Sequence, residues 1–343
     1  MTQEDIIALK KRLSTPQNIA IVIHYNPDGD ALGSSLALAM YLTKLGHRVN
    51  VLSPNIYPAY LEWMPNCEKV LIATEQLQLC ESIITEADII FCLDFNAFHR
   101  ASLLEPALAA SKKFKVLIDH HIDPIQDFDI IYSLTSQTSS TSELIYQFIA
   151  DKLNDKHLID KRMAECMYVG IITDTGSLSY SCNNASTYSI VGDLMKFGID
   201  GEIIHKRVYD NFSEDRVHLL GYCLFKRLIV LDEYSTSYIY LTKEDLNYFN
   251  YQQGDTEGIV NYGLSIKNVR FTAIFTERDE RIRISFRSKG NFDVNSFARD
   301  HFNGGGHKNA SGGNSYVSMN ETIENFIRLL PQYKSLLNQP WDE

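Results

Sequence analysis

Short apolar runs rich in β-branched residues alternate with longer amphipathic stretches over the first 120 residues of the chain. Residues 18–24, 48–53, 87–95 and 114–121 have the length and composition of buried strands, whereas residues 31–46 repeat apolar positions with the period of a helix. Strands that alternate with helices are typical of an open, mostly parallel sheet. We therefore predict an α/β fold whose N-terminal part is a mostly parallel β-sheet flanked by helices.

Helical periodicity continues in the middle of the chain. It covers residues 141–153, 160–172 and 186–198, and the following segment, 200–227, is also helical in pattern. That last segment is polar enough to connect two domains. We place the boundary between residues 195 and 228.

The pattern changes from helical to strand-like after residue 227. Apolar and polar positions alternate with a period of two, which predicts one antiparallel pair within 227–242 and another within 269–289. A glycine-rich stretch at 303–313 and a final helix near 321–337 complete the chain. The predicted organisation is a first domain over residues 1–195, a helical linker over 196–227 and a smaller C-terminal α/β domain over 228–343.

Composition narrows the classes of protein that fit. With 343 residues and 45% hydrophobic content, the chain is large enough for two buried cores. A formal net charge of −11 disfavours binding of a long nucleic-acid duplex, although a small anion in a locally positive pocket remains allowed. The six cysteines form no close pair, so buried reduced thiols are favoured over disulfides. With no secretory signal and no run of about 20 apolar residues, we expect a cytoplasmic protein without a membrane partner.

Acidic and imidazole side chains follow several of the apolar runs, and we place them at predicted strand ends. Taken alone, the run from His24 to Asp30 is as typical of a turn or a helix cap as of a functional site, and Asp94 is typical of a plain strand-end carboxylate. The triplet at 119–121 is harder to explain structurally, because two adjacent imidazoles and a carboxylate make a poor core and a good ligand set. Together they form a set rich in oxygen ligands with a minority of imidazoles, which suits two hard divalent cations held about 3.5–4 Å apart on a phosphate ester. The set consists of His24, Asp28, Asp30, Asp94, Asp119, His120, His121 and Asp174.

A second group of residues indicates anion binding in the C-terminal part. Arg281, Arg283, Arg287 and Lys289 alternate along one predicted strand and therefore share a face. We expect the backbone amides of the glycine-rich stretch at 304–306 to approach an anion, with His307 at the start of a helix. The alternative is a solvated basic edge strand followed by a helix cap.

The ordered motifs NPDGDALGS, LDFN, DHH and TDTGS resemble those of the DHH phosphoesterases. The segment 283–313, with its GGGH loop, is similar to the DHHA1 domain found in the nano-RNase and pAp-phosphatase branch of that family. The resemblance covers nearly the whole chain. It implies a DHH catalytic domain with a di-metal site, followed by a DHHA1 substrate-binding domain.

The resemblance also implies a role for each matching residue. One metal ion would be held by His24, Asp28 and Asp94, and the other by Asp30, Asp94, His120 and Asp174, with Asp94 bridging. His121 would contact the phosphate or stabilise the transition state, and Asp119 would hold an imidazole in place, so that His121, Asp94 and Asp119 would be the catalytic residues. The family cation is usually manganese, so we expect two Mn²⁺ ions, with Mg²⁺ or Co²⁺ as substitutes. The expected substrate contacts are Arg287, Ser288, Gly305, Gly306, His307 and Arg100.

Two further features have competing interpretations. The polar run at 136–143 resembles a helix N-terminus with Glu143 placed as in a capping box, and the alternative is that it lines the phosphate site. Arg100 either reaches a substrate phosphate or is a surface arginine at the start of a helix. Capping is the favoured interpretation of the first feature.

The expected function is hydrolysis of short oligoribonucleotides to mononucleotides, and of 3′-phosphoadenosine 5′-phosphate to AMP and phosphate, through a hydroxide that bridges two metal ions. The nearest alternative is a phosphodiesterase for a cyclic dinucleotide or for pApA. An alternative from a different class of protein is a non-catalytic, nucleotide-binding sensor. The sequence leaves the oligomeric state open, with a homodimer as one alternative.

Overall fold

The computed structural model describes residues 1–135, 137–180, 182–252 and 254–339. The chain divides into two compact units, Met1–Asn211 and Phe212–Glu343. The division falls within the segment predicted as a helical linker. That segment is not a free connector, because Ile204 and Val208 of α8 (Gly201–Tyr209) are buried in the first unit and Leu219 of α9 (Glu214–Tyr222) is buried in the second.

The first unit contains a parallel sheet, as the alternating pattern predicts. Its six strands have the order β3-β2-β1-β4-β5-β6, and every neighbouring pair is parallel. The strands are β1 (Asn18–Val22), β2 (Arg48–Ser53), β3 (Leu71–Ile72), β4 (Ile89–Leu93), β5 (Phe114–Asp119) and β6 (Ile130–Ser133). The edge strands β3 and β6 were missed, because two to four residues are too few to show a clear period.

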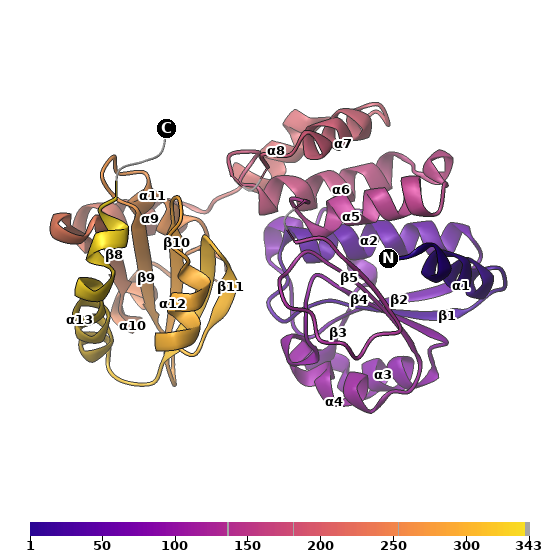
Figure 1. Ribbon diagram of the computed structural model, residues 1–343, viewed down its shortest axis with the longest axis horizontal. Coiled ribbons are helices and arrows are strands. Elements are labelled where there is room, and N and C mark those ends of the chain that lie inside the picture. Colours follow the sequence, from indigo (N-terminus) through magenta and orange to yellow (C-terminus); the bar gives the residue numbers. More distant parts are fainter. Residues whose placement is uncertain (136, 181, 253, 340–343) are drawn as a thin grey trace. The chain divides into compact units, whose positions relative to one another are not determined.

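Helices cover both faces of this sheet (Figure 1). Alternate residues of β1 point to opposite faces, so Ile19 and Ile21 join one core while Ala20 and Val22 join the other. The first core also contains residues of α1 (Gln3–Leu13), α2 (Gly29–Lys44), α5 (Thr141–Gln147) and α6 (Lys161–Asp174). The second contains residues of α3 (Ala73–Glu86) and α4 (Glu105–Ala110).

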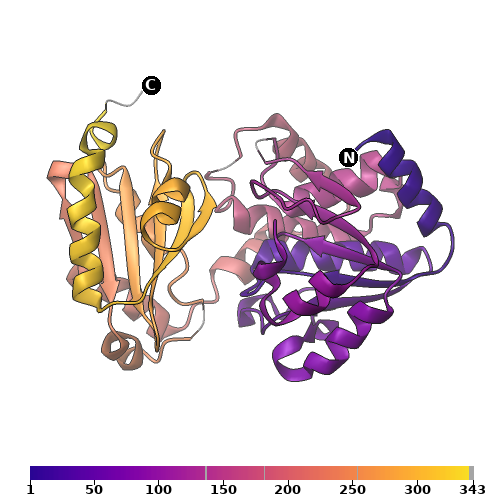
Figure 2. The ribbon, with the colours of Figure 1, turned by 60° about the horizontal axis from the view of Figure 1, so that its bottom comes forward.

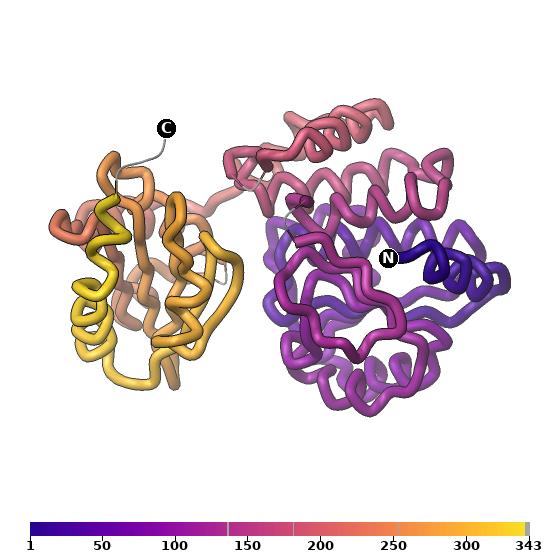
Figure 3. Tube along the Cα trace, viewed as in Figure 1, coloured from indigo at the N-terminus to yellow at the C-terminus, as the bar shows by residue number. Residues whose placement is uncertain are grey.

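The helical layer extends beyond α6 through α7 (Ala185–Met195) and α8, which both pack against α6 (Figure 3). Short helices connect the main elements. They are the 3₁₀ helices at Ala59–Leu61, Cys67–Lys69, Phe98–Leu104 and Lys156–Leu158, and a π-helical turn at Phe148–Lys152.

The second unit is built on a mixed sheet with the strand order β11-β12-β10-β9-β8-β7. Both predicted pairs are present, since β7 is antiparallel to β8 and β9 to β10, whereas β8 and β9 run parallel. The strands are β7 (Leu228–Leu231), β8 (Thr236–Leu241), β9 (Phe271–Glu277), β10 (Ile282–Ser288), β11 (Gly305–His307) and β12 (Ala310–Ser315).

Two cores also lie on the faces of the second sheet. A phenylalanine-rich core joins the sheet to α12 (Val294–His301) and α13 (Met319–Leu337), the latter lying along one side of the sheet (Figure 2). On the other face, α9, α10 (Lys243–Tyr248) and α11 (Ile259–Leu264) pack against Ile239 and Ile274. The remaining short helices are a π-helical turn at Cys223–Arg227 and a 3₁₀ helix at Asp232–Tyr234. Among the helices described in either unit, none is both long and apolar enough to span a bilayer.

Candidate metal centre

The polar residues that follow β1, β4 and β5 meet at one edge of the parallel sheet. These three strands are neighbours, so their carboxyl ends lie side by side, which is where ligands gather in open α/β sheets. His24 follows β1, Asp94 follows β4, and Asp119 ends β5 directly before the two histidines. The prediction that distant parts of the sequence deliver their side chains to a common edge is confirmed for these residues.

The turn after β1 leads directly into α2. Asn26 adopts a left-handed conformation with φ of 57°, and Asp28 caps the helix by accepting hydrogen bonds from the amides of Asp30 and Ala31 at 2.9 and 3.1 Å. The capping interpretation of Asp28 is therefore correct for one of its oxygens. The same side chain lies within a group with His24 and Asp94 whose ligand atoms are all within 4.8 Å of one another.

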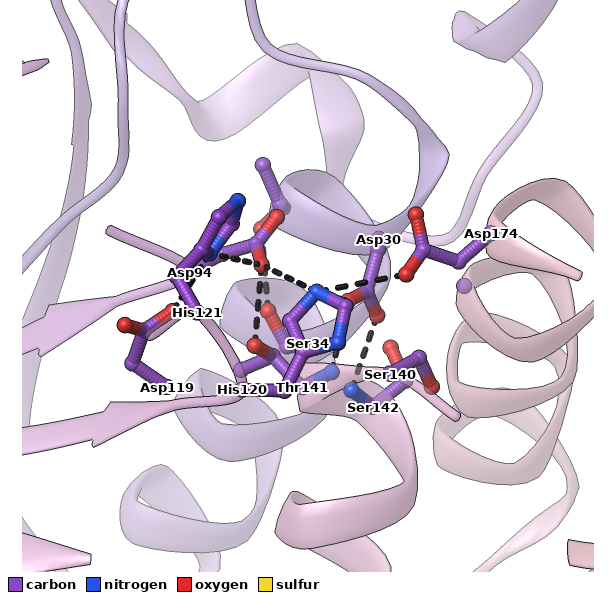
Figure 4. Close-up of polar contacts among 12 residues, drawn as sticks. Asp30, Ser34, Asp94, Asp119, His120, His121, Ser140, Thr141, Ser142 and Asp174 are labelled. Atoms are coloured by element: carbon purple, nitrogen blue, oxygen red, sulfur yellow. Dashed lines mark hydrogen bonds and ion pairs between the residues drawn. The ribbon is translucent and has the colours of Figure 1, made fainter. Parts of the chain in front are cut away.

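Asp94 is the residue shared between the two sides of the site (Figure 4). One carboxylate oxygen, Oδ2, lies 3.4 Å from Nε2 of His24, and the other, Oδ1, lies 3.5 Å from Nε2 of His120. The residue is 2% exposed and has a left-handed φ of 64°, a conformation that aspartate tolerates better than most residues. The end of β4 thus turns its carboxylate into the space between two imidazoles.

Asp30 lies on the His120 side of the site. Its carboxylate accepts hydrogen bonds from the amides of Thr141 and Ser142 at 2.6 and 2.8 Å, and its Oδ2 lies 4.0 Å from Nε2 of His120. The side chain is fully buried. Asp30, Asp94 and His120 form a second group whose ligand atoms lie within 4.8 Å of one another.

Asp174 reaches the site from a helix and not from a strand. We placed it at the end of a predicted strand because an apolar run precedes it, but that run is the last part of α6, and Asp174 is the final residue of the helix. Its Oδ2 lies 3.2 Å from Nε2 of His120. The helical period predicted over residues 160–172 agrees with α6, so the placement of Asp174 at a strand end was wrong.

His121 and Asp119 form a hydrogen-bonded pair beside the shared carboxylate. Nδ1 of His121 lies 2.7 Å from Oδ1 of Asp119 and 3.8 Å from Oδ1 of Asp94. The Asp119 side chain is fully buried, while that of His121 is 16% exposed. Asp119 therefore holds the ring of His121 in place.

The electrostatics of the site suit cations. Burial, followed by the nearby charge of Asp30, raises the pKa of Asp94 well above its usual range, and burial raises the pKa of Asp30 to about 7. Burial also lowers the pKa of His24 and so favours the neutral ring, the form that binds metals. The two groups of three share Asp94, and their carboxylate and imidazole donors fit a pair of divalent cations.

Arg100 lies near His24 on the 3₁₀ helix Phe98–Leu104. Its backbone carbonyl accepts a hydrogen bond from the amide of Tyr25 at 2.7 Å, and its positive charge adds to burial in lowering the pKa of His24. The structure thus brings Arg100 to the metal centre. Its contact with a substrate phosphate stays a prediction.

The predicted substrate contacts of the second unit lie on β10 and β11. Arg283 and Arg287 share one face of β10, as predicted. Ser288 is buried, donates its hydroxyl to the carbonyl of Phe292 at 2.6 Å and accepts a hydrogen bond from Asn309 at 2.9 Å. This serine holds the turn after β10, and its role as a substrate contact stays a prediction.

The glycine-rich stretch differs from the prediction. His307 does not begin a helix, because Gly305, Gly306 and His307 form β11 and pair with β12. The amide of Gly306 donates to the side chain of Asn295 at 2.9 Å, and that of Gly304 donates to the carbonyl of Ala298 at 3.2 Å. These two amides hold the loop, so they are not available to an anion.

The polar run before α5 contains contacts that the sequence did not reveal. Ser140 is the N-cap and accepts a hydrogen bond from the amide of Glu143, which confirms helix capping, whereas Ser136 lies outside the described residues. Glu143 is at the N3 position of a capping box, as predicted, but its carboxylate accepts a hydrogen bond from the amide of Ser139 at 2.9 Å, one residue before the cap. Thr141 donates its hydroxyl to Oδ1 of Asp94 at 2.9 Å. The sequence carries no signal for the contact between Glu143 and Ser139 or for that between Thr141 and Asp94.

Comparison with known proteins agrees with this geometry. Residues 18–171 match the DHH family, N-terminal domain, and residues 235–335 match the DHHA1 domain. The probable bifunctional oligoribonuclease and PAP phosphatase NrnA of Streptococcus mutans is 28% identical over 314 residues, which cover 91% of this chain and 94% of the relative. The bifunctional oligoribonuclease and PAP phosphatase NrnA of Bacillus subtilis is 27% identical over 308 residues, which cover 90% and 92%.

A solved structure is similar over nearly the full length. The exopolyphosphatase-related protein from Bacteroides fragilis is 42% identical, with a TM-score of 0.94 and 98% of both chains covered. Together with the two family matches, this similarity shows that the chain belongs to the DHH family of phosphoesterases and carries a DHHA1 domain as its second domain.

Proposed function

We propose that this protein is a metal-dependent phosphoesterase that hydrolyses short oligoribonucleotides to mononucleotides and 3′-phosphoadenosine 5′-phosphate to AMP and phosphate. The observation that carries the proposal is the shared carboxylate of Asp94. It has one oxygen beside His24 and the other beside His120, and each side has a further carboxylate, Asp28 on one and Asp30 on the other. Two carboxylate and imidazole groups joined by one aspartate are typical of sites that hold two cations against a phosphate.

The residues that would hold the cations follow from the two groups. His24, Asp28 and Asp94 would hold one ion, and the other would be held by Asp30, Asp94, His120 and Asp174. The mixture of carboxylate and imidazole suits Mn²⁺, with Mg²⁺ or Co²⁺ as substitutes. When bound, such ions lower the pKa of a coordinated water and neutralise the oxygens of a phosphate ester.

The protein's own contribution to the chemistry includes the pair formed by His121 and Asp119. An ionised carboxylate only accepts hydrogen bonds, so the short contact makes Nδ1 of His121 the donor and fixes the orientation of the ring. In this proposal, His121 contacts the reacting phosphate and Asp119 positions it.

The substrate class in this proposal rests on the relatives and on charge. The relatives from Streptococcus mutans and Bacillus subtilis bear the name oligoribonuclease and PAP phosphatase. A net charge of −11 opposes binding of a long polyanion, whereas Arg283 and Arg287 on one face of β10 offer a local positive surface for a small one. Short nucleotides meet both conditions.

Product analysis with manganese-loaded protein tests the proposal. The substrates are 3′-phosphoadenosine 5′-phosphate, RNA of about two to five nucleotides, a cyclic di-adenosine nucleotide and, because of the name of the Bacteroides fragilis relative, inorganic polyphosphate. We expect AMP from the first and mononucleotides from the second. Preferred cleavage of the cyclic compound or of polyphosphate would replace this substrate assignment, and tight nucleotide binding without turnover of any substrate would make the protein a sensor.

A further inference from the structure

The side chain of Thr141 contacts the one carboxylate that both cation groups share. Thr141 is the first residue of α5 and is fully buried. Its hydroxyl donates to Oδ1 of Asp94 at 2.9 Å, and its backbone amide donates to Oδ2 of Asp30 at 2.6 Å. A single residue outside the ligand set thus holds two of the ligands in place (Figure 4).

We infer that Thr141 is a positioning residue that sets the orientation of the shared carboxylate of Asp94. Rotation of an aspartate carboxylate about its last torsion is only weakly restricted by the side chain itself. Here the hydroxyl of Thr141 donates a hydrogen bond to Oδ1 of Asp94, on the side of His120. Oδ2 of Asp94 then faces Nε2 of His24 at 3.4 Å. The hydrogen bond therefore assigns one oxygen to each group, which is the arrangement that a bridging ligand needs.

The segment directly before Thr141 is held by the buried carboxylate of Glu143. This side chain is fully buried and accepts hydrogen bonds from the amide and hydroxyl of Ser139 at 2.9 and 2.7 Å. It also accepts from Ser186 and Thr187, at the start of α7, at 3.1 and 2.8 Å. A buried carboxylate without partners would be costly, and these donors stabilise it. The network joins the segment before Thr141 to the start of α7.

The inference rests on the proposed pair of cations, and its test measures cation binding and not turnover. Isothermal titration of the protein with MnCl₂ gives the number and affinity of the ions, and electron paramagnetic resonance distinguishes a coupled pair of Mn²⁺ ions from isolated ones. Thr141→Val removes the hydroxyl at nearly constant volume and keeps the backbone amide. We expect about 10- to 100-fold weaker binding of at least one ion and loss of the coupled signal.

Two variants serve as controls. Thr141→Ser keeps a hydroxyl and should bind both ions within about threefold of the unmodified protein, because the contact to Asp94 is retained. Thr322→Val removes another fully buried hydroxyl, which lies 2.8 Å from that of Ser315 in the second unit, and should leave Mn²⁺ binding unchanged.

The outcomes separate the inference from the proposed function. If the unmodified protein binds no pair of Mn²⁺ ions, the proposed function fails. If it binds a pair and Thr141→Val binds the same pair with equal affinity and the same spectrum, the positioning role of Thr141 is overturned while the proposed function stands. Should Thr141→Val not fold, the folded fractions of Thr141→Ser and Thr141→Ala are compared, and equal Mn²⁺ affinities would contradict the inference.

Discussion

Gly170 of α6 lies directly against the carboxylate of Asp30 on α2. A Cβ atom at position 170 would stand 2.6 Å from Oδ1 of Asp30 and would also collide with the hydroxyl of Ser142. The missing side chain therefore lets two helices and the start of α5 converge on one buried carboxylate. Close helix packing and the metal centre depend on the same glycine.

Gly170→Ala should damage both stability and cation binding. The added methyl group cannot be accommodated without moving Asp30 or Ser142, and we expect a loss of about 1–3 kcal/mol in the free energy of unfolding. Urea unfolding and titration with MnCl₂ measure the two effects. Gly192→Ala on α7, where a Cβ would meet nothing within 4 Å, is the matched control and should gain up to about 1 kcal/mol. Equal behaviour of the two variants would contradict the packing argument.

Asp94→Asn should abolish the proposed cation pair without harming the fold. Asparagine keeps the shape of the side chain and tolerates the left-handed φ of 64°, but it removes the charge that both groups share. We expect Mn²⁺ affinity and turnover to fall by more than about 100-fold. Asp94→Ala should have the same effect and should also lower the free energy of unfolding, because alanine does not favour the left-handed φ. Calorimetric titration and product analysis check this, with circular dichroism as the control for folding. Near-normal turnover in either variant would refute the shared role of Asp94.

Glu143→Ala should loosen α5 from α7. The substitution leaves the buried donors of Ser139 and Thr187 without their acceptor, and we expect a loss of about 3 kcal/mol in the free energy of unfolding. Glu143→Gln keeps one acceptor oxygen and should lose less. Chemical denaturation gives the free energy of unfolding of both variants and of the unmodified protein. An alanine variant as stable as the glutamine variant would show that these hydrogen bonds do not stabilise the fold.

Asp245 in the second unit should make stability depend on pH. Burial opposes its ionisation, but hydrogen bonds from Arg227 at 2.7 Å, from the amide of Thr242 at 3.0 Å and from Tyr222 at 2.8 Å outweigh burial and hold its pKa below the ordinary value of 3.8. Because the folded state binds the proton less readily than the unfolded state, the stabilisation is fully present above pH 3.8 and is lost as the pH falls through the lowered pKa.

Asp245→Asn tests this dependence. At pH 7 the variant should be about 1–3 kcal/mol less stable than the unmodified protein, because Arg227 loses its charged partner. The difference should shrink as the pH is lowered below 3.8. Urea unfolding at several pH values measures it, and a difference that does not change with pH would exclude the linkage.

The six cysteines should be inert in the folded protein. All six are buried and free, and burial raises the pKa of the Cys67 thiol to about 11 and that of Cys223 to about 12. Since the thiolate is the reactive form, we expect no fast reaction with a disulfide reagent under native conditions and six equivalents after unfolding in urea. A fast-reacting thiol in the folded state would show that one of the buried sites opens readily.

The local pattern of the sequence determined the class of fold and the chemistry of the site. Alternation of apolar runs and amphipathic stretches predicts the parallel sheet, because side-chain burial imposes these periods on the chain. The residues that close β4 and β5, Asp94 and the triplet from Asp119 to His121, could be assigned to one edge of the sheet for the same reason. Family resemblance added the grouping of these ligands, which the distances around Asp94 support.

Only the tertiary structure decided which contacts hold these ligands in place. The β-strand conformation of Gly305 to His307 and the hydrogen bond that ties Thr141 to Asp94 both depend on partners that no local pattern of the sequence identifies. The amide of Gly306 is occupied by Asn295 for the same reason. Periodicity indicates which face of a helix or strand is buried, but not which segment packs against that face. The packing segment decides how the side chains at the site are oriented.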